Sequence, residues 1–309
     1  MTPMYVVSIT GGKGGTGKSF VATNLAYYLA SRLGGLRIVL ADLDVEAPND
    51  HILLGVNRLE NMEDIDIFFP KIIYEKCTAC GACVKVCDTG AMIMAPGKPP
   101  FVFPRLCSGC KACYYACPYD AIRREGRRTL AHSYETPISI GSASFTLVTG
   151  VLKEGEEHTP PAIIAAKKRA LGLKPDVLLV DTGAGTGSGV STAIHGSDLV
   201  IAVTEPTPLG VHDLKSILEV VEGMGYEALV VVNRHGIGPS EAILEVVQNY
   251  SNVRGLYRIP YSRRAAEAYA RGVPVIHYYP DDPASQALAR LGGDVLARLR
   301  DAGVVDGGG

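Results

Sequence analysis

Two groups of residues in this sequence have the types and the spacing that binding chemistry requires. The first is the glycine-rich stretch GGKGGTGKS, residues 11–19, in which two lysines and one serine are spaced among glycines. Glycines allow successive backbone N–H groups to face an anion, and lysine adds positive charge for a phosphate. The second group is a pair of runs, CTACGACVKVC and CSGCKACYYACP, which together contain all eight cysteines of the chain. The sequence therefore predicts a phosphate site in the glycine-rich stretch and metal or cluster binding by the cysteines.

The glycine-rich stretch matches the Walker A pattern G-x-x-x-x-G-K-S. A β-branched apolar run precedes it and a helical apolar pattern follows it, which is the strand, loop and helix context that the pattern requires. We expect Lys18 to neutralise the β- and γ-phosphates of ATP and the hydroxyl of Ser19 to bind Mg²⁺. A glycine-rich turn without a ligand is the alternative. The residues predicted to bind ATP in this loop are Gly12, Gly14, Gly15, Thr16, Gly17, Lys18 and Ser19.

The position of the first lysine makes the loop more specific. Lys13 directly follows the first glycine of the pattern, and GKGGTGKS therefore resembles the deviant Walker A motif of the MinD/ParA/Mrp class of P-loop ATPases. In that class the additional lysine crosses a dimer interface and contacts the nucleotide of the partner. The resemblance implies a nucleotide-dependent homodimer in which Lys13 stabilises charge on the transferred phosphoryl group, as an arginine finger does. A solvent-exposed loop lysine is the alternative.

Two further apolar runs end in aspartates. LRIVLADLDVEAPN contains Asp42 and Asp44, which point the same way if the strand continues through them, and DVLLVDTGAGTG contains Asp181. In the resembling class these segments are switch I and the Walker B strand with switch II. The resemblance implies that Asp44 positions or activates the attacking water, that Asp42 lies near the metal, and that Asp181 holds Mg²⁺ through water. Simple helix caps are the alternative.

Later strand patterns indicate the architecture that positions these residues. Apolar runs at 199–204 and 229–233 are each followed by a helical pattern, and this alternation predicts a mainly parallel, doubly wound sheet with helices on both faces. Asn233 lies at the carboxyl end of one such run. The resembling class uses an asparagine there to contact adenine. The predicted fold class is therefore an α/β P-loop NTPase fold.

Both cysteine runs have the spacing C-x₂-C-x₂-C-x₃-C of bacterial ferredoxins, in which the fourth cysteine of a run binds the other cluster. Zinc in two four-cysteine sites is the alternative metal, and disulfides are less expected in a chain without a secretory signal. Asp88 follows the fourth cysteine of the first run, where the pattern has a proline, and adds negative charge near a cluster. The predicted ligands are Cys77, Cys80, Cys83 and Cys117 for one 4Fe-4S cluster, and Cys87, Cys107, Cys110 and Cys113 for the second.

The cysteine runs lie between the strand of Asp42 and the strand of Asp181, so they interrupt the predicted ATPase domain. We expect a discontinuous MinD-like P-loop ATPase domain at 1–60 and 140–309, with a small α+β ferredoxin-like domain inserted at 61–139. The charged stretch 150–164 that follows is expected to be a solvated loop in which proline starts a helix, with a metal site as the alternative. The whole chain resembles MinD-superfamily ATPases that carry an inserted ferredoxin domain.

Composition argues against several partners. A net charge of −2 gives no electrostatic case for nucleic acid, and the apolar runs are shorter than the roughly 20 residues of a membrane span. The first residues lack a basic segment typical of a secretory signal, so we expect a cytoplasmic protein without stable membrane anchoring. The helical pattern at 284–300 is expected to close the core rather than to lie on a membrane.

These features predict an ATP-binding and ATP-hydrolysing iron–sulfur protein. In the main interpretation, nucleotide-dependent dimerisation is coupled to electron transfer through two 4Fe-4S clusters to or from an unidentified partner protein. The alternative is an ATPase that assembles or carries iron–sulfur clusters or another metallocofactor for a partner. A spatial organiser like MinD and ParA is a third possibility, but it requires a membrane-binding tail or a basic face for DNA.

Overall fold

The computed structural model describes residues 4–305, and this part of the chain divides into two compact units. The first consists of Met1–Met62, Ser133–Val151 and Ile163–Gly309, and the second of Glu63–His132 and Leu152–Ala162. The second unit differs from the insert predicted at 61–139 in two ways. Its main segment ends at His132, and it also includes the later segment Leu152–Ala162. The assignment of these units to an ATPase domain and a ferredoxin-like domain stays a prediction.

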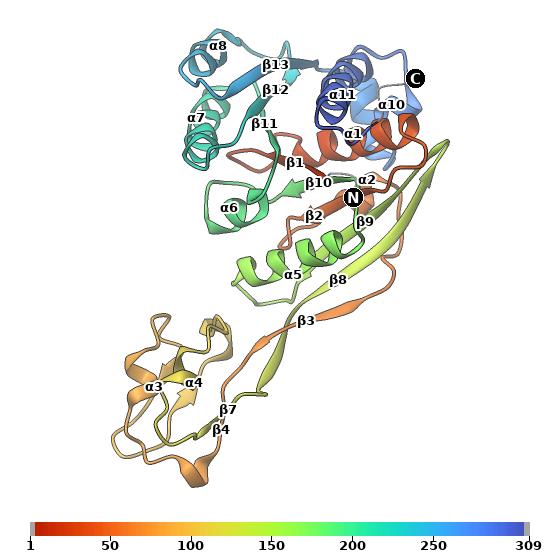
Figure 1. The fold of residues 1–309 in the computed structure, drawn as a ribbon. Helices are drawn as coiled ribbons and strands as arrows, with labels where there is room; N and C mark the ends of the chain where they lie inside the picture. The colour runs from red at the N-terminus through yellow and green to blue at the C-terminus, as the bar shows by residue number, and fades with distance from the viewer. Residues whose placement is uncertain (1–3, 306–309) are drawn as a thin grey trace. The chain divides into compact units, whose positions relative to one another are not determined.

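A large sheet organises the first unit, and the order of its strands there is β13-β12-β11-β1-β10-β2-β9-β8, with β8 continuing into the second unit. Every pairing from β13 to β9 is parallel. The strand β1 lies between β10 and β11, which come much later in the chain, so the strand order reverses beside β1 (Figure 1). Ligands of such sheets bind at the carboxyl ends of the strands near this point. The strands are β1 (Tyr5–Thr10), β2 (Ile38–Leu43), β3 (Glu63–Phe68), β8 (Arg127–Ile140), β9 (Ala143–Leu152), β10 (Val177–Thr182), β11 (Leu199–Thr204), β12 (Ala228–His235) and β13 (Val253–Pro260).

The central strands are apolar throughout because helices cover both of their faces. All six residues of β2, of β10 and of β11 are buried. Along β11, Ile201 and Val203 pack into one hydrophobic core, while Val200 and Ala202 pack into another. This alternation is the period of two that a strand buried on both faces requires. The structure thus confirms the predicted α/β fold with a large, mainly parallel sheet.

The helices fall on the two sides of this sheet. Residues of α1, α9, α10 and α11 contribute to one core, and residues of α6, α7 and α8 contribute to the other. The helices of the chain outside the cysteine runs are α1 (Lys18–Arg32), α2 (Asp50–Leu53), α5 (Thr159–Gly172), α6 (Ser188–Ile194), α7 (Pro208–Gly223), α8 (Glu241–Gln248), α9 (Arg263–Ala270), α10 (Val275–Tyr278) and α11 (Pro283–Asp301).

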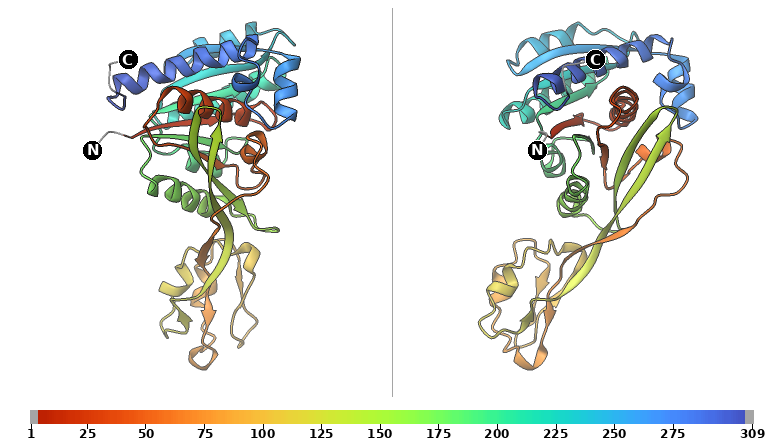
Figure 2. Two further views of the ribbon diagram at one scale, coloured as in Figure 1. Left: turned by 90° about the vertical axis from the view of Figure 1, so that its right-hand side faces the viewer. Right: turned by 45° about the vertical axis from the view of Figure 1, so that its right-hand side comes forward.

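The long helix α11 closes the first core, as the sequence predicts. It lies along α1, which Figure 2 shows as a blue helix beside a red one. Its buried side chains recur every three or four residues, and a Cβ at Gly292 would collide with the ring of Tyr28 on α1. Glycine therefore allows the two helices to approach closely. Within residues 4–305, no helix is both long and apolar enough to cross a membrane.

The second unit repeats one small motif twice. Each copy contains a short 3₁₀ helix, a cysteine-bearing loop and one turn of α-helix, and the helical turn begins after a residue with left-handed backbone, Gly81 in one copy and Lys111 in the other. Two antiparallel pairs, β4 with β7 and β5 with β6, hold the copies together. The elements are β4 (Lys71–Ile72), η1 (Tyr74–Lys76), α3 (Ala82–Lys85), β5 (Met92–Ile93), β6 (Phe101–Val102), η2 (Pro104–Leu106), α4 (Ala112–Tyr115) and β7 (Ile122–Arg123).

Candidate nucleotide site and cysteine sites

The glycine-rich loop connects the central strand β1 to the N-terminus of α1. A Cβ on Gly12 would lie 2.5 Å from the backbone oxygen of Asp213, so this position has no room for a side chain. Gly17 has a φ of 97° and directly precedes α1, a left-handed conformation that glycine adopts without strain. Gly14 and Gly15 are exposed, and a Cβ on either would meet no other atom within 4 Å. The loop is thus packed on one side and open on the other.

The open side of the loop faces a cleft of about 330 Å³. This volume is within the usual range for small-molecule sites. On its far side the cleft is bounded by residues 259–269, which include two exposed tyrosines, Tyr261 and Tyr269. The predicted site residues that line the cleft are Gly14, Gly15, Gly17, Lys18, Ser19, Asp44 and Asn233. Gly12, Lys13, Thr16, Asp42 and Asp181 are not among its lining residues.

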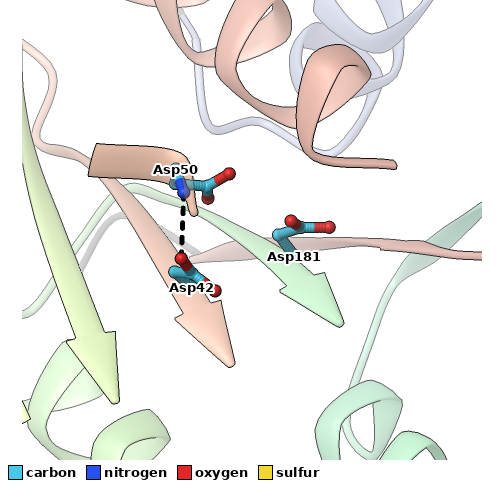
Figure 3. Close-up of side chains that lie close together, drawn as sticks. All are labelled: Asp42, Asp50 and Asp181. Atoms are coloured by element: carbon cyan, nitrogen blue, oxygen red, sulfur yellow. Dashed lines mark hydrogen bonds between the residues drawn. The ribbon is translucent and has the colours of Figure 1, made fainter. Parts of the chain in front are cut away.

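Two of the predicted metal-site residues meet at adjacent strand ends. Asp42 of β2 and Asp181 of β10 are register partners in the parallel sheet, so their side chains emerge on the same side. A third acid, Asp50, joins them from the start of α2 (Figure 3). One carboxylate oxygen from each of the three lies within 4.8 Å of the others, and the residues are at most 1% exposed.

Sequence reasoning missed Asp50. In the sequence it precedes the apolar run HILLG, where an acid at a helix start is ordinary. Its proximity to Asp181 depends on a contact between residues 131 positions apart, which no local pattern reports.

Hydrogen bonds satisfy part of this acidic cluster. Asp42 accepts backbone N–H bonds from Asp44 at 3.2 Å, Asn49 at 2.9 Å and Asp50 at 3.1 Å. Ser19 donates its hydroxyl to Oδ2 of Asp181 at 2.5 Å. Within the described residues, no N–H or hydroxyl group donates to either carboxylate oxygen of Asp50 or to Oδ1 of Asp181, and a hydrogen bond between these two acids requires a shared proton. Buried oxygens of this kind are what Mg²⁺ or another hard cation prefers as ligands.

Burial also disfavours the charged forms of these acids. It raises the pKa of Asp42 and of Asp50 well above the ordinary value for aspartate, and the negative charge of Asp181 adds to both shifts. Burial likewise raises the pKa of Asp181 to about 7, although the Ser19 hydrogen bond and the Lys18 charge oppose the shift. Near neutral pH the cluster therefore needs a proton or a cation to compensate its charge.

Asp44 has a different environment. It lines the cleft beside Lys18 and is half-buried. Burial raises the pKa of Asp44, while the charge of Lys18 lowers it. A Cβ on Gly183 would lie 3.4 Å from Oδ1 of Asp44, so the ends of the predicted switch I and switch II segments are close together.

Lys13 points to an acid of its own chain. Its Nζ atom lies 2.8 Å from Oε1 of Glu205, and the other oxygen of Glu205 accepts a hydrogen bond from Arg234 at 3.0 Å. Sequence reasoning missed Glu205, which directly follows β11 and has no motif around it that marks it. The predicted contact of Lys13 with a partner nucleotide requires a second chain and stays a prediction.

Asn233 contacts the phosphate-binding loop. Its Nδ2 donates to the backbone oxygen of Thr16 at 2.8 Å, and its Oδ1 accepts from the N–H of Arg234 at 2.9 Å. The side chain also occupies the space where a Cβ on Gly17 would lie. The structure therefore gives Asn233 a contact that braces the loop, while the predicted contact with adenine stays a prediction.

In the second unit the cysteines surround two separate cavities. Both cavities combine cysteines of the two runs. Each run contributes its first three cysteines to one cavity and its fourth to the other, which is the crossed grouping that the ferredoxin spacing predicts. One cavity is lined by Cys77, Cys80, Cys83 and Cys117, and the other by Cys87, Cys107, Cys110 and Cys113.

The residues that line the two cavities suit a bound iron–sulfur cluster, because cysteine thiols are available as ligands and the rest of the lining is largely apolar. Apolar residues of the surrounding core, such as Met92 and Ile122, form much of the remaining lining. Burial raises the pKa of the thiols of Cys83 and Cys107, and that of Cys113 to about 12. Thiolates are therefore unfavourable there without a cation, whereas metal binding deprotonates a coordinating thiol.

The charged segment after β9 is a loop that leads into α5 at Thr159, as the sequence predicts, and Glu154 and Glu157 are exposed, but other residues of the loop make specific contacts. Glu156 pairs with Arg128, and Arg128 also donates to the backbone oxygen of Cys107 at 3.1 Å. Arg105 donates to the backbone oxygen of Gly155 at 2.8 Å. These contacts were not predicted because the partners lie far apart in the sequence, and they hold the loop of the second cysteine run in place.

Comparisons with known proteins agree with this geometry. The family model described as "CobQ/CobB/MinD/ParA nucleotide binding domain" matches residues 7–275. The chain is 34% identical to the uncharacterized protein MJ0579 of Methanocaldococcus jannaschii over 278 residues, which cover 90% of this chain and 94% of that protein. It is 26% identical to an iron-sulfur cluster carrier protein of Methanococcus maripaludis over 311 residues, which cover 96% of this chain and 86% of that protein.

Among solved structures, the septum site-determining protein MinD from Pyrococcus horikoshii, complexed with Mg-ADP, has a TM-score of 0.57 at 22% identity. The similarity covers 96% of this chain and 98% of that one, and it establishes a common fold. The predicted relationship to MinD and ParA is confirmed by the family model, whose match includes the phosphate-binding loop and both aspartate-ended strands. The chain therefore belongs to the CobQ/CobB/MinD/ParA nucleotide-binding family.

Proposed function

We propose that this protein is an ATPase that carries iron–sulfur clusters and delivers them to a partner protein. The observation that supports it most is the grouping of eight cysteines around two cavities in a chain of this ATPase family. The similarity to iron-sulfur cluster carrier proteins along nearly the whole chain favours delivery of clusters over the electron transfer that the sequence first suggested. In this proposal the clusters are cargo.

The cleft beside the glycine-rich loop is the proposed ATP site. Backbone N–H groups of the loop and the buried Lys18 would hold the phosphates, with Lys18 balancing their charge. Ser19 and the acids at the ends of β2 and β10 would hold Mg²⁺, which when bound supplies positive charge to the phosphate oxygens.

Asp44 is the proposed positioning group for the attacking water. It lines the cleft and is only half-buried, so a water molecule can reach it. Water attacks the γ-phosphorus, the bond to the β–γ bridging oxygen breaks, and ADP and phosphate leave. Asp44 would accept a hydrogen bond from that water and so fix its direction of approach.

Hydrolysis is proposed to require a homodimer. Lys13 lies outside the lining of the cleft of its own chain. Transfer of its amine to the phosphates of a second chain would add the positive charge that the transition state needs. The pair with Glu205 must then break, which links dimer formation to turnover.

Delivery of a cluster requires that acceptor thiols reach the iron. Each cysteine set contains one exposed cysteine, Cys80 in the first and Cys110 in the second. These are the positions at which an acceptor thiolate can first replace a ligand. The more buried Cys107 and Cys113 would release last.

Electron transfer is the second candidate function, and a specific observation favours it. Two complete four-cysteine sets with crossed ligands are the arrangement of two-cluster ferredoxins, which retain their clusters. This function predicts clusters that stay bound during turnover and midpoint potentials that differ between nucleotide states.

The proposal can be tested on anaerobically reconstituted protein. We expect about four irons and four labile sulfides per cysteine set, ATP hydrolysis that Lys18→Ala abolishes, and midpoint potentials that are the same without nucleotide, with MgADP and with a non-hydrolysable ATP analogue. Potentials that shift by tens of millivolts between these states would instead support coupled electron transfer. Failure to bind iron or to hydrolyse ATP would overturn the proposal.

A further inference from the structure

Asp50 places a third carboxylate in a site where two would be enough to orient a hydrated Mg²⁺. Its side chain comes from the first residue of α2 and points toward Asp181, as Figure 3 shows. Its backbone N–H already donates to Asp42, so the position of its side chain is fixed at the backbone. The residue is 0% exposed.

Three buried carboxylates in this space are costly without a counter-charge. A buried ionised group that has neither a hydrogen bond nor an ionic partner is strongly unfavourable. Yet no N–H or hydroxyl group among residues 4–305 donates to either oxygen of Asp50 or to Oδ1 of Asp181, and the two acids face each other closely enough to share a proton. Lys18 contributes one positive charge to the neighbourhood, against the three acids of the cluster and the nearby Asp44.

We infer that Asp50, together with Asp42 and Asp181, forms a cation site that holds a hard divalent ion such as Mg²⁺ before the nucleotide binds. The donors are all carboxylate oxygens, a set that suits Mg²⁺, Mn²⁺ or Ca²⁺ and disfavours softer metals. Because Ser19 is hydrogen-bonded to Asp181, the site adjoins the hydroxyl proposed to bind the metal of MgATP. Asp50 thus keeps the cation beside the phosphate-binding loop between rounds of hydrolysis.

The competing explanation is a proton shared between two of the acids. A carboxyl pair that holds one proton is stable in a buried site and needs no metal. The two explanations differ in a direct way. A cation site binds metal in the absence of nucleotide, and this binding depends on Asp50. A pair of acids that shares a proton binds no metal without nucleotide.

The test measures Mn²⁺ binding to the full, cluster-loaded chain without nucleotide, by the EPR signal of free Mn²⁺ and its recovery on addition of Mg²⁺. The inference rests on the proposed ATP site for its biological use, but this measurement does not involve ATP, so the two can fail separately. We expect one Mg²⁺-displaceable Mn²⁺ site in the wild type and at least tenfold weaker binding in Asp50→Asn. Glu46→Gln, which removes an exposed acid of the same segment, is the matched control and should change the affinity less than twofold.

The inference is overturned if nucleotide-free wild type shows no Mg²⁺-displaceable site, or if Asp50→Asn binds Mn²⁺ as the control does. Thermal unfolding supplies a second readout. Mg²⁺ should raise the melting temperature of the wild type and of Glu46→Gln but not that of Asp50→Asn. If Asp50→Asn does not fold, Asp50→Ser is measured in its place with the same expectations.

Discussion

The amine of Lys13 lies 2.8 Å from a carboxylate oxygen of Glu205 in the same chain. Glu205 is further held by Arg234 at 3.0 Å. Burial raises the pKa of Glu205, but its bonds to Lys13 and Arg234 outweigh burial and keep that pKa below its ordinary value. Lys13 is therefore stabilised away from the cleft, in a position that it must leave before it can serve a partner nucleotide.

Glu205→Gln should make activation easier. The substitution removes the charge that retains Lys13 but keeps a side chain of the same size. A partly exposed ion pair contributes up to about 1 kcal/mol, which corresponds to roughly a fivefold change in an equilibrium. The protein concentration that gives half-maximal ATPase activity should fall by about this factor.

Glu227→Gln is the control for this experiment, since Glu227 pairs with Arg254 and Arg298 and does not contact the glycine-rich loop. It should leave the concentration dependence unchanged. Lys13→Ala should remove most activity at every concentration. An unchanged or higher half-maximal concentration for Glu205→Gln would mean that the pair does not restrain Lys13.

Asn233→Ala should weaken the binding of ATP and of inorganic tripolyphosphate by the same factor. The side chain donates to the backbone oxygen of Thr16, so its loss leaves a buried acceptor unsatisfied and loosens the loop that holds the phosphates. An unsatisfied buried group costs about 1–3 kcal/mol, or roughly five- to 150-fold in affinity. Calorimetric titration of both ligands checks the prediction. A loss confined to ATP would show that Asn233 acts through the adenine base.

The crossed grouping of the cysteines predicts the iron content of double variants. Cys87→Ser with Cys107→Ser alters one cavity, although the residues belong to different runs. We expect this variant to retain about four irons on the other set. Cys77→Ser with Cys87→Ser alters both cavities and should retain almost none. Iron and labile sulfide assays after anaerobic reconstitution measure this, and the reverse result would mean that each run binds its own cluster.

The metal-free protein should lose stability as the pH rises. The pKa of Asp181 is raised to about 7, so the folded state holds more protons than the unfolded state above an ordinary aspartate pKa of about 3.9. This contribution is fully present below that ordinary value and is lost as the pH rises through about 7. In EDTA, the unfolding free energy of the wild type relative to Asp181→Asn, which lacks this titrating group, should therefore fall between about pH 4 and pH 8.

The expected fall is on the order of 1–4 kcal/mol, because one unit of pKa corresponds to about 1.4 kcal/mol. Urea unfolding of both proteins at several pH values measures it. With saturating Mg²⁺, the unfolding free energies of the two proteins should change with pH by the same amount. A difference that is constant with pH in EDTA would contradict the assignment of coupled protonation to these acids.

Local patterns were sufficient for much of the site. Strand, glycine loop and helix are contiguous in sequence, so the positions of Lys18 and Ser19 could be predicted without a fold. The same holds for the two cysteine sets, whose spacing repeats within each run. The mainly parallel sheet also follows from local information, because strands buried on both faces are apolar throughout.

The missed features depend on contacts between distant segments. Glu205 meets Lys13 across 192 positions, and Asp50 meets Asp181 across 131. The pairing of Glu156 with Arg128 likewise depends on the return of the chain to the second unit after β9. In each case the residue has an ordinary local explanation as a charged surface or helix-start residue, and the actual partner is determined by topology.

The central claim, that ATP turnover drives delivery of clusters, is tested most directly by the initial rate of cluster transfer to apo-aconitase. The cluster-loaded protein is mixed with the acceptor under anaerobic conditions, with or without MgATP, and recovered aconitase activity is followed. We expect transfer that MgATP accelerates at least fivefold in the wild type but not in Lys18→Ala. Clusters that remain on the protein under all of these conditions would contradict delivery and would identify an electron carrier instead.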